Sequence, residues 1–148
     1  MKTKIPPPIL ALLMIGLVYL SSLLIGSVSF AYQASLSVLL VIVGLSCALP
    51  SFRLFARNKT TISPFTPSET SVLITEEMYR YSRNPMYLGL LLLIIAATIW
   101  FGTWVEIIIA LFFILLINIS QIIPEEVAHL QIIGEEYQEY KKKVKRWI

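Results

Sequence analysis

The chain has 148 residues, of which 57% are hydrophobic and 14% are charged, and it contains no aspartate. Its mean hydropathy of +0.77 is that of an integral membrane protein and excludes an ordinary soluble enzyme. The formal net charge of +3 is too small and too dispersed for the dense basic face that nucleic-acid binding requires.

Four apolar segments approach the roughly 20 residues that a helix needs to cross a bilayer. They cover residues 6–26, 33–50, 86–101 and 104–123. The sequence therefore predicts an all-α integral membrane protein with about four transmembrane helices. The basic start before the first segment also fits a signal peptide, but we favour a retained span because the apolar run is long and three prolines stand at its head.

The basic residues are distributed unevenly among the connections. All 12 Lys and Arg residues lie at the N-terminus, between the second and third segments, or after the fourth. The other two connections, around SVSFAYQ and WFGTWVE, contain none. The positive-inside rule therefore predicts that both termini and residues 51–84 are cytoplasmic. The same charge favours contact with anionic membrane lipids.

The two halves of the chain differ in character. Residues 1–50 form two spans without a charged residue in either, and we expect them to be packing helices. Residues 51–148 hold the polar chemistry, in a cytoplasmic loop, a transmembrane hairpin and a C-terminal tail. Small residues that permit close helix approach in the first half are Gly16, Ser22, Gly26 and Gly44.

The third and fourth segments are joined only by FGTW, which predicts a tight antiparallel hairpin. Such a hairpin brings YSRNPMY, residues 81–87, close to QIIPEEVAHL, residues 121–130. From Pro124 onward, apolar residues recur at intervals of three and four, as in an amphipathic helix on the membrane surface. Gly134 is a candidate point of division within this helix.

The start of the third span has the features of an anion site. Asn84 precedes a proline, so it suits the N-cap position, and Pro85 suits the first helical position. The amides of Met86 and Tyr87 then point unpaired toward the cytoplasm, at the positive end of the helix. Two arginines frame this helix start, Arg80 and Arg83. The alternative is that these arginines only anchor the helix at the lipid headgroups.

Two carboxylates, Glu125 and Glu126, follow the fourth span. They stabilise a helix start, or they hold a cationic ligand opposite the anion site. His129 lies one turn beyond, but it is the only histidine and no Cys or Asp accompanies it. We therefore expect no metal site.

Two blocks of this sequence resemble a known family. The stretch KTTISPFTPSETSVLITEEMYRYSRNPMYLG, followed by a hydrophobic hairpin and PEEVAHLQIIGEEYQEYKKKVKRW, is similar to the isoprenylcysteine carboxyl methyltransferase family. The resemblance covers about residues 50–147 and is most specific in the order and spacing of the two blocks. It implies transfer of a methyl group from S-adenosylmethionine to a lipophilic acceptor, foremost a prenylcysteine-like carboxylate, at the cytoplasmic membrane face.

The resemblance also implies which residues hold the methyl donor. In this chain they are Pro64, Ser71, Val72, Leu73, Ile74, Tyr79, Asn84, Pro85, Met86, Tyr87 and Glu125. The donor carboxylate suits the helix start, and its ammonium or sulfonium suits Glu125. The catalytic candidates are Arg83, Gln121 and Glu125, with Arg83 as the cation that orients the substrate.

Two positions depart from the family pattern. The family usually has His where this chain has Asn84, which keeps hydrogen-bonding capacity but loses a titrating ring. Eukaryotic members have an arginine, which meets the substrate carboxylate, where this chain has Gln121. Glutamine forms hydrogen bonds but cannot neutralise a carboxylate. The acceptor class therefore stays open.

Other functions remain as alternatives at this stage. One is methylation of a phospholipid or another small lipid. A second is an NADPH-dependent membrane reductase, because sterol reductases have a similar hairpin and tail. A third is a non-catalytic scaffold or small transporter, although no ionisable residue lies deep in the predicted spans and Glu106 lies near the outer end.

Overall fold

The computed structural model describes residues 5–58, 73, 75–102 and 106–148, with the backbone alone at residues 52 and 54–58. The described residues form helices and contain no strand, which confirms the predicted all-α class. The α-helices are α1 (Pro7–Leu24), α2 (Gln33–Asn58), α3 (Pro85–Phe101), α4 (Glu106–Ile117), α5 (Ile123–Ile133) and α6 (Glu135–Lys143). A 3-10 turn η2 (Glu77–Arg80) precedes α3, and a π-helical turn η3 (Asn118–Ile122) joins α4 to α5.

Three helical stretches are long and apolar enough to cross a membrane: Pro7–Leu24, Gln33–Ser51 and Glu106–Ile133. The fourth, α3, has 17 residues, which lies at the lower end of the range of about 17–25 for a spanning helix. Large apolar side chains on α1 and α2 are exposed, including Leu12 at 68% and Ile42 at 57%. Such surfaces suit a lipid environment and agree with a multi-pass membrane protein.

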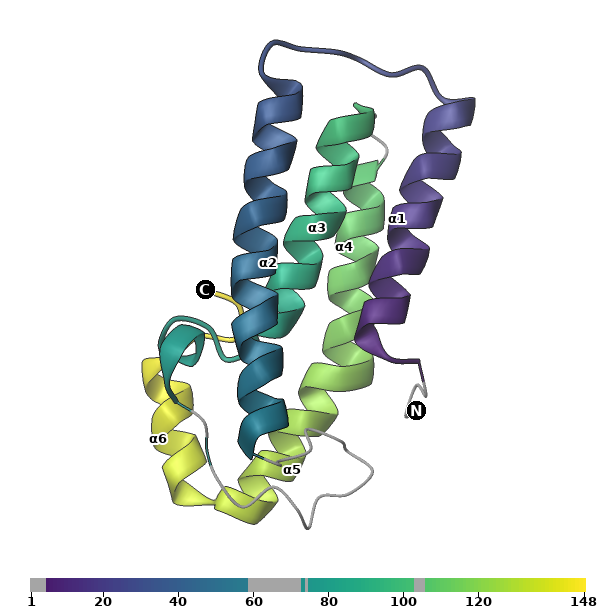
Figure 1. The fold of residues 1–148 in the computed structure, drawn as a ribbon. Coiled ribbons are helices and arrows are strands. Elements are labelled where there is room, and N and C mark those ends of the chain that lie inside the picture. The colour runs from purple at the N-terminus through teal and green to yellow at the C-terminus, as the bar shows by residue number, and fades with distance from the viewer. Residues whose placement is uncertain (1–4, 59–72, 74, 103–105) are drawn as a thin grey trace.

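Helices α1 to α4 run side by side, and their connections divide the molecule into two ends (Figure 1). The chain between α1 and α2 lies at one end. The described N-terminus, α5 and α6 lie toward the other, which we call the basic end because it also holds Arg80, Arg83 and residues 141–146. The basic end corresponds to the side that the sequence predicts to be cytoplasmic.

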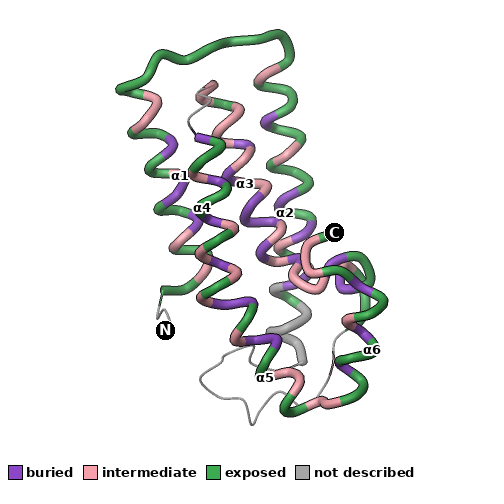
Figure 2. The backbone as a smooth tube through the Cα atoms, turned by 180° about the vertical axis from the view of Figure 1, so that it is seen from behind, coloured by how far each residue is buried: buried purple, intermediate pink, exposed green. Residues whose placement is uncertain are grey.

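The main core lies among α1, α3 and α4. Ile94, Phe113 and Ile117 are fully buried at its centre, and Met14 joins it from α1. Buried positions therefore concentrate in α3 and α4, whereas α1 and α2 are mostly exposed (Figure 2). This arrangement places the α3–α4 hairpin at the centre of the main core.

Helix α2 approaches α3 very closely through two glycines. A Cβ atom added to Gly89 would lie 2.5 Å from the carbonyl oxygen of Gly44 and 2.7 Å from the Cβ of Ala48. The predicted packing role of Gly44 is therefore confirmed. The same prediction is wrong for Gly16 and Gly26, because neither would bring an added Cβ within 4 Å of another atom.

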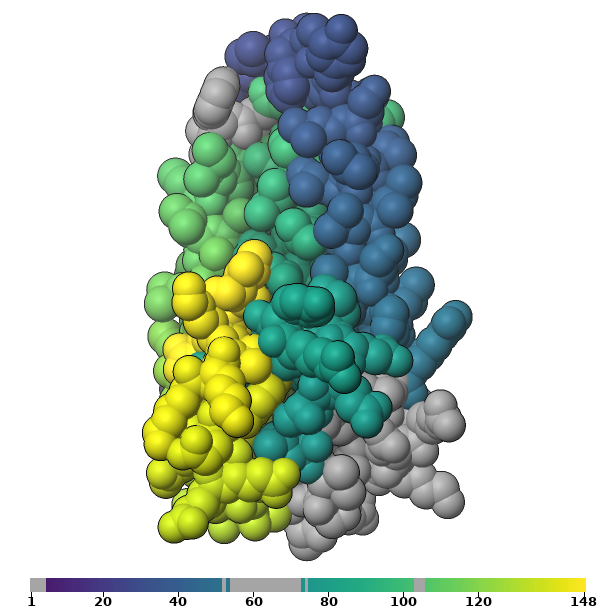
Figure 3. Space-filling model, turned by 90° about the vertical axis from the view of Figure 1, so that its left-hand side faces the viewer, coloured from purple at the N-terminus to yellow at the C-terminus, as the bar shows by residue number. Residues whose placement is uncertain are grey.

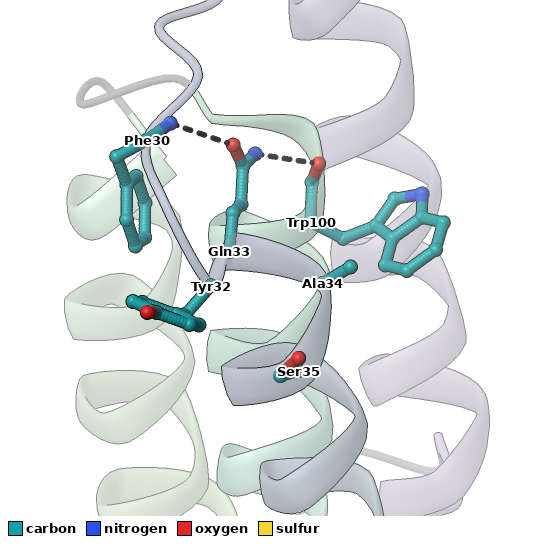
Figure 4. Close-up of a pocket in the computed structure, with 6 residues that line it drawn as sticks. All are labelled: Phe30, Tyr32, Gln33, Ala34, Ser35 and Trp100. Atoms are coloured by element: carbon teal, nitrogen blue, oxygen red, sulfur yellow. Dashed lines mark hydrogen bonds between the residues drawn. The ribbon is translucent and has the colours of Figure 1, made fainter.

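At the end opposite the basic end, the Gln33 side chain bonds to three backbone groups, two of them in α3, and Figure 4 shows the bonds to Phe30 and Trp100. Its Nε2 donates hydrogen bonds to the carbonyl oxygens of Ile99, at 2.7 Å, and Trp100, at 2.9 Å. Its Oε1 accepts a bond from the Phe30 N–H at 3.2 Å. One neutral side chain thus satisfies carbonyls at the C-terminus of α3, which would otherwise lack partners within the helix.

Helix α1 is fixed to α4 by a polar contact. The Ser21 hydroxyl donates a hydrogen bond of 3.0 Å to Oε1 of Glu106, the first residue of α4, which is fully buried. No hydrogen-bond partner for the second oxygen, Oε2, lies among the described residues. By contrast, the Ser22 hydroxyl donates a hydrogen bond of 2.7 Å to the carbonyl oxygen of Tyr19 in its own helix.

Two helices extend beyond their predicted bounds. Helix α2 runs to Asn58 with Pro50 inside it, although the sequence predicts a loop from residue 51. Its last eight residues contain no glycine and include favourable helix formers, so the helix continues past the proline. The fourth span likewise continues through η3 into α5. Gly134 does divide the tail, with a φ of 70° between α5 and α6.

We predict that Gly89→Ala destabilises the protein by about 1–3 kcal/mol, since the new methyl group clashes with backbone atoms of α2. Gly16→Ala is the matched control, because an added Cβ meets open space there. Thermal unfolding in detergent measures both variants. Equal melting temperatures for the two would contradict the close approach of α2 and α3.

Candidate active site

The first residues of α3 meet the first residues of α5 at the basic end. The Tyr87 hydroxyl donates a hydrogen bond of 2.7 Å to Oε1 of Glu125, although 38 positions separate the two residues. Tyr87 is 4% exposed and Glu125 is 7% exposed. The prediction that the hairpin brings YSRNPMY and QIIPEEVAHL together is therefore confirmed.

Helix α3 begins at the predicted residue, but the predicted hydrogen bond to the N-cap side chain is absent. Pro85 is the first helical residue, and Asn84 occupies the N-cap position. The Asn84 side chain makes no capping hydrogen bond. Its Nδ2 instead donates a bond of 2.9 Å to the carbonyl oxygen of Arg146, and its backbone N–H donates to Ser82 Oγ at 3.1 Å. The predicted capping bond is wrong because the C-terminal backbone takes up this side chain.

Glu126 lies beside this contact and is surrounded by cations. Nε and Nη2 of Arg146 donate to its two carboxylate oxygens at 2.9 and 2.8 Å. Arg83 Nη1 lies 3.0 Å from one oxygen, and Lys141 Nζ lies 3.8 Å from the other. Paired, two-point contacts of this kind are among the strongest hydrogen bonds in proteins. Three cations facing one carboxylate leave a surplus of positive charge, which suits an anionic ligand.

Arg83 is the most confined of these cations, with a side chain that is 10% exposed. Its Nη1 is close to Glu126 but is not aligned for a hydrogen bond, and neither Nη1 nor Nε has a hydrogen-bond partner among the described residues. Buried N–H groups without partners are costly. Arg83 therefore has two nitrogens without a hydrogen-bond partner among the described residues, at the place where the sequence predicts a substrate-orienting cation.

A cluster of tyrosines forms the floor of this region. Tyr79, in η2, is buried, and its carbonyl oxygen accepts a hydrogen bond of 2.6 Å from the Tyr140 hydroxyl. Tyr137 packs against Tyr140, and Leu73 packs on the pair. Burial raises the pKa of Tyr79, an effect that a hydrogen bond with Ser51 partly offsets, and burial raises the pKa of Tyr140 to about 12. These hydroxyls are therefore neutral hydrogen-bonding groups at physiological pH.

The remaining candidates fall into three groups. Gln121 is buried within the π turn η3, and π turns often occur at functional sites. Met86 packs against the main core, so its side chain contributes to the fold. The other candidates lie outside the described residues: Pro64, Ser71, Val72 and Ile74.

The C-terminal tail contributes contacts that the sequence did not reveal. Figure 3 shows the tail, in yellow, against the teal segment that leads into α3. Arg146 contacts both Glu126 and Asn84. The backbone N–H of Arg83 donates a hydrogen bond of 3.0 Å to the carbonyl oxygen of Lys145. No sequence signal separates Arg146 from its basic neighbours, because the positive-inside rule explains all of them equally well.

Comparison with known proteins gives one family. A family model described as phospholipid methyltransferase matches residues 32–136, from the start of α2 to the start of α6. An uncharacterized protein of Haemophilus influenzae (strain ATCC 51907 / DSM 11121 / KW20 / Rd) is 47% identical over 66 residues, which are 43% of this chain and 100% of that protein. No solved structure matches significantly.

We predict that Tyr140→Phe lowers the free energy of unfolding by about 1 kcal/mol or more, because the carbonyl oxygen of Tyr79 loses its buried donor. Tyr81→Phe is the control, since Tyr81 is 71% exposed. Chemical denaturation in detergent checks this pair. A loss of stability in Tyr81→Phe as large as that in Tyr140→Phe would contradict the assignment.

Proposed function

Because the chain belongs to the phospholipid methyltransferase family, we propose that it is a membrane enzyme that moves a methyl group from S-adenosylmethionine to a lipid acceptor at the cytoplasmic face. The observation that carries the proposal is the hydrogen bond between Tyr87 and Glu125. It joins two polar sequence blocks, YSRNPMY and QIIPEEVAHL, that lie at the same end of the α3–α4 hairpin. The surplus of positive charge nearby supports a cytoplasmic position for this end.

The side chains around this bond fit the charged groups of the proposed donor. S-adenosylmethionine supplies an activated methyl group on a sulfonium, and its amino-acid end carries an ammonium and a carboxylate. Glu125 provides a buried carboxylate for a cationic group. Arg83 provides two buried nitrogens without hydrogen-bond partners among the described residues, which suits a carboxylate or a phosphate. The two residues thus provide an acidic group and a basic group at the same end of the bundle.

We propose a phospholipid amine as the acceptor, because the neutral Gln121 stands where a carboxylate-binding arginine would be expected. An amine reacts only after it has lost a proton, so the site needs a proton acceptor. Glu125, which is buried and already oriented by Tyr87, is the candidate for that role. The remaining task for the protein is alignment of the acceptor, which contributes about 7–11 kcal/mol in favourable cases.

A prenylcysteine-like carboxylate is the second candidate acceptor, and one observation favours it. The partner-free nitrogens of Arg83 suit a carboxylate as well as a phosphate. A carboxylate is already ionised at neutral pH, so this reaction needs no proton acceptor. In either case the lipid part would lie among exposed apolar side chains of the bundle and the polar end would reach the basic end.

We predict that Glu125→Gln weakens the binding of S-adenosylmethionine by at least tenfold, because the amide cannot neutralise a cationic ligand. Isothermal titration of the purified protein in detergent measures the dissociation constant. The control is Glu136→Gln, an exposed position on α6. Equal dissociation constants for wild type and Glu125→Gln would remove the assignment, as would competition by NADPH without competition by S-adenosylhomocysteine.

A second experiment identifies the acceptor. Wild-type protein in vesicles that contain both phosphatidylethanolamine and a farnesylcysteine derivative is incubated with S-adenosylmethionine labelled in the methyl group. We expect the label in the phospholipid, in a form that resists mild base because an N–CH₃ bond is stable. Label that mild base releases as methanol would identify a carboxyl ester and favour the second candidate. Absence of transfer to any lipid would count against the methyltransferase proposal.

A further inference from the structure

The last residues of the chain contact the site through both side chain and backbone. The Arg146 guanidinium binds both oxygens of Glu126, and its carbonyl oxygen accepts bonds from Asn84 Nδ2, at 2.9 Å, and Ser82 Oγ, at 3.5 Å. The next residue, Trp147, packs against the main core. One residue therefore connects the carboxylate at the start of α5 to the turn that begins α3.

The Arg146 contact also determines what remains available on Arg83. Because Arg146 donates to both oxygens of Glu126, that carboxylate already has two well-aligned donors. Arg83 lies 3.0 Å from the same carboxylate but without an aligned hydrogen bond. Nε and Nη1 of Arg83 therefore have no hydrogen-bond partner among the described residues, and donors of this kind suit another anion.

We infer that Arg146 is a positioning residue of the active site, which engages Glu126 so that Arg83 keeps its donors for an anionic group of the donor or substrate. The inference rests on the proposed function for the identity of those ligands. Arg146 lies beyond residue 136, where the match to the phospholipid methyltransferase family model ends, so that match does not assign this role.

Anchoring to lipid headgroups does not account for these contacts. The Arg146 side chain is 36% exposed, whereas that of Lys142 is 70% exposed and, among the described residues, pairs with Glu139 on its own helix. The hydrogen bond with Glu126 also raises the pKa of Arg146 above its usual range. Lysine cannot reproduce the planar, two-point contact, which makes the choice of arginine specific.

The experiment compares Arg146→Gln, Arg146→Lys and Lys142→Gln in the full-length protein in detergent. Two quantities are measured: the dissociation constant of S-adenosylmethionine and the rate of backbone hydrogen exchange in residues 81–87. We expect Arg146→Gln to weaken binding by about tenfold to a hundredfold and to accelerate exchange. Arg146→Lys should lie between Arg146→Gln and wild type, and Lys142→Gln should match wild type.

A destabilised control separates positioning from general stability. Ser21→Ala removes the hydrogen bond to Glu106 at the opposite end, and we expect it to lower the melting temperature without changing the dissociation constant. If Arg146→Gln retains wild-type binding, or loses no more affinity than Ser21→Ala at an equal melting temperature, the positioning role is wrong. If wild type does not bind S-adenosylmethionine but Arg146→Gln still accelerates exchange in residues 81–87, the proposed function fails and the positioning of this segment stands.

Discussion

The hydrogen bond between Tyr87 and Glu125 is the constraint on which the site depends, and the geometry of the helical hairpin makes it possible. Helix α3 has 17 residues, and α4 with η3 has 12 and five, which is the same number. Two antiparallel helical stretches of equal length end level with each other, at about 1.5 Å per residue. The starts of α3 and α5 therefore meet at one end of the bundle, and polar residues placed there become neighbours.

The electrostatics at the basic end follow from the different surroundings of two adjacent carboxylates. Glu125 faces Tyr87, a neutral donor, and is almost completely buried. Glu126 faces Arg83, Lys141 and Arg146. Removing a carboxylate from water is costly unless charge or hydrogen bonds compensate it, so Glu126 is stabilised by its partners. Glu125, with a single neutral donor described beside it, is the better placed of the two to receive a cation.

The sequence predicted the features that neighbouring residues determine, such as turns and helix starts. It did not predict the contacts made by the folded C-terminal tail. The hairpin follows from the short FGTW connection, the start of α3 from Pro85, and the break in the tail from Gly134. The partner of Asn84 could not be predicted, because the carbonyl oxygen of Arg146 belongs to a residue 62 positions away in the sequence. The prediction of helix contacts from glycines was also partly wrong, since nothing in the sequence distinguishes Gly44, at a helix contact, from Gly16, which is exposed in α1.

The π turn η3 changes the rotation of α5 about the helix axis relative to α4. Because this turn contains one extra residue, each residue that follows lies about 100° behind its position in an uninterrupted α-helix. Without that offset, the residues after Ile122 would project in different directions from the bundle axis. The side chain that now meets Tyr87 would turn toward another neighbour. The π turn thus sets the direction in which the side chains of α5 project. The chemistry of this end therefore depends on the number of residues in η3 as much as on the residue types that follow it.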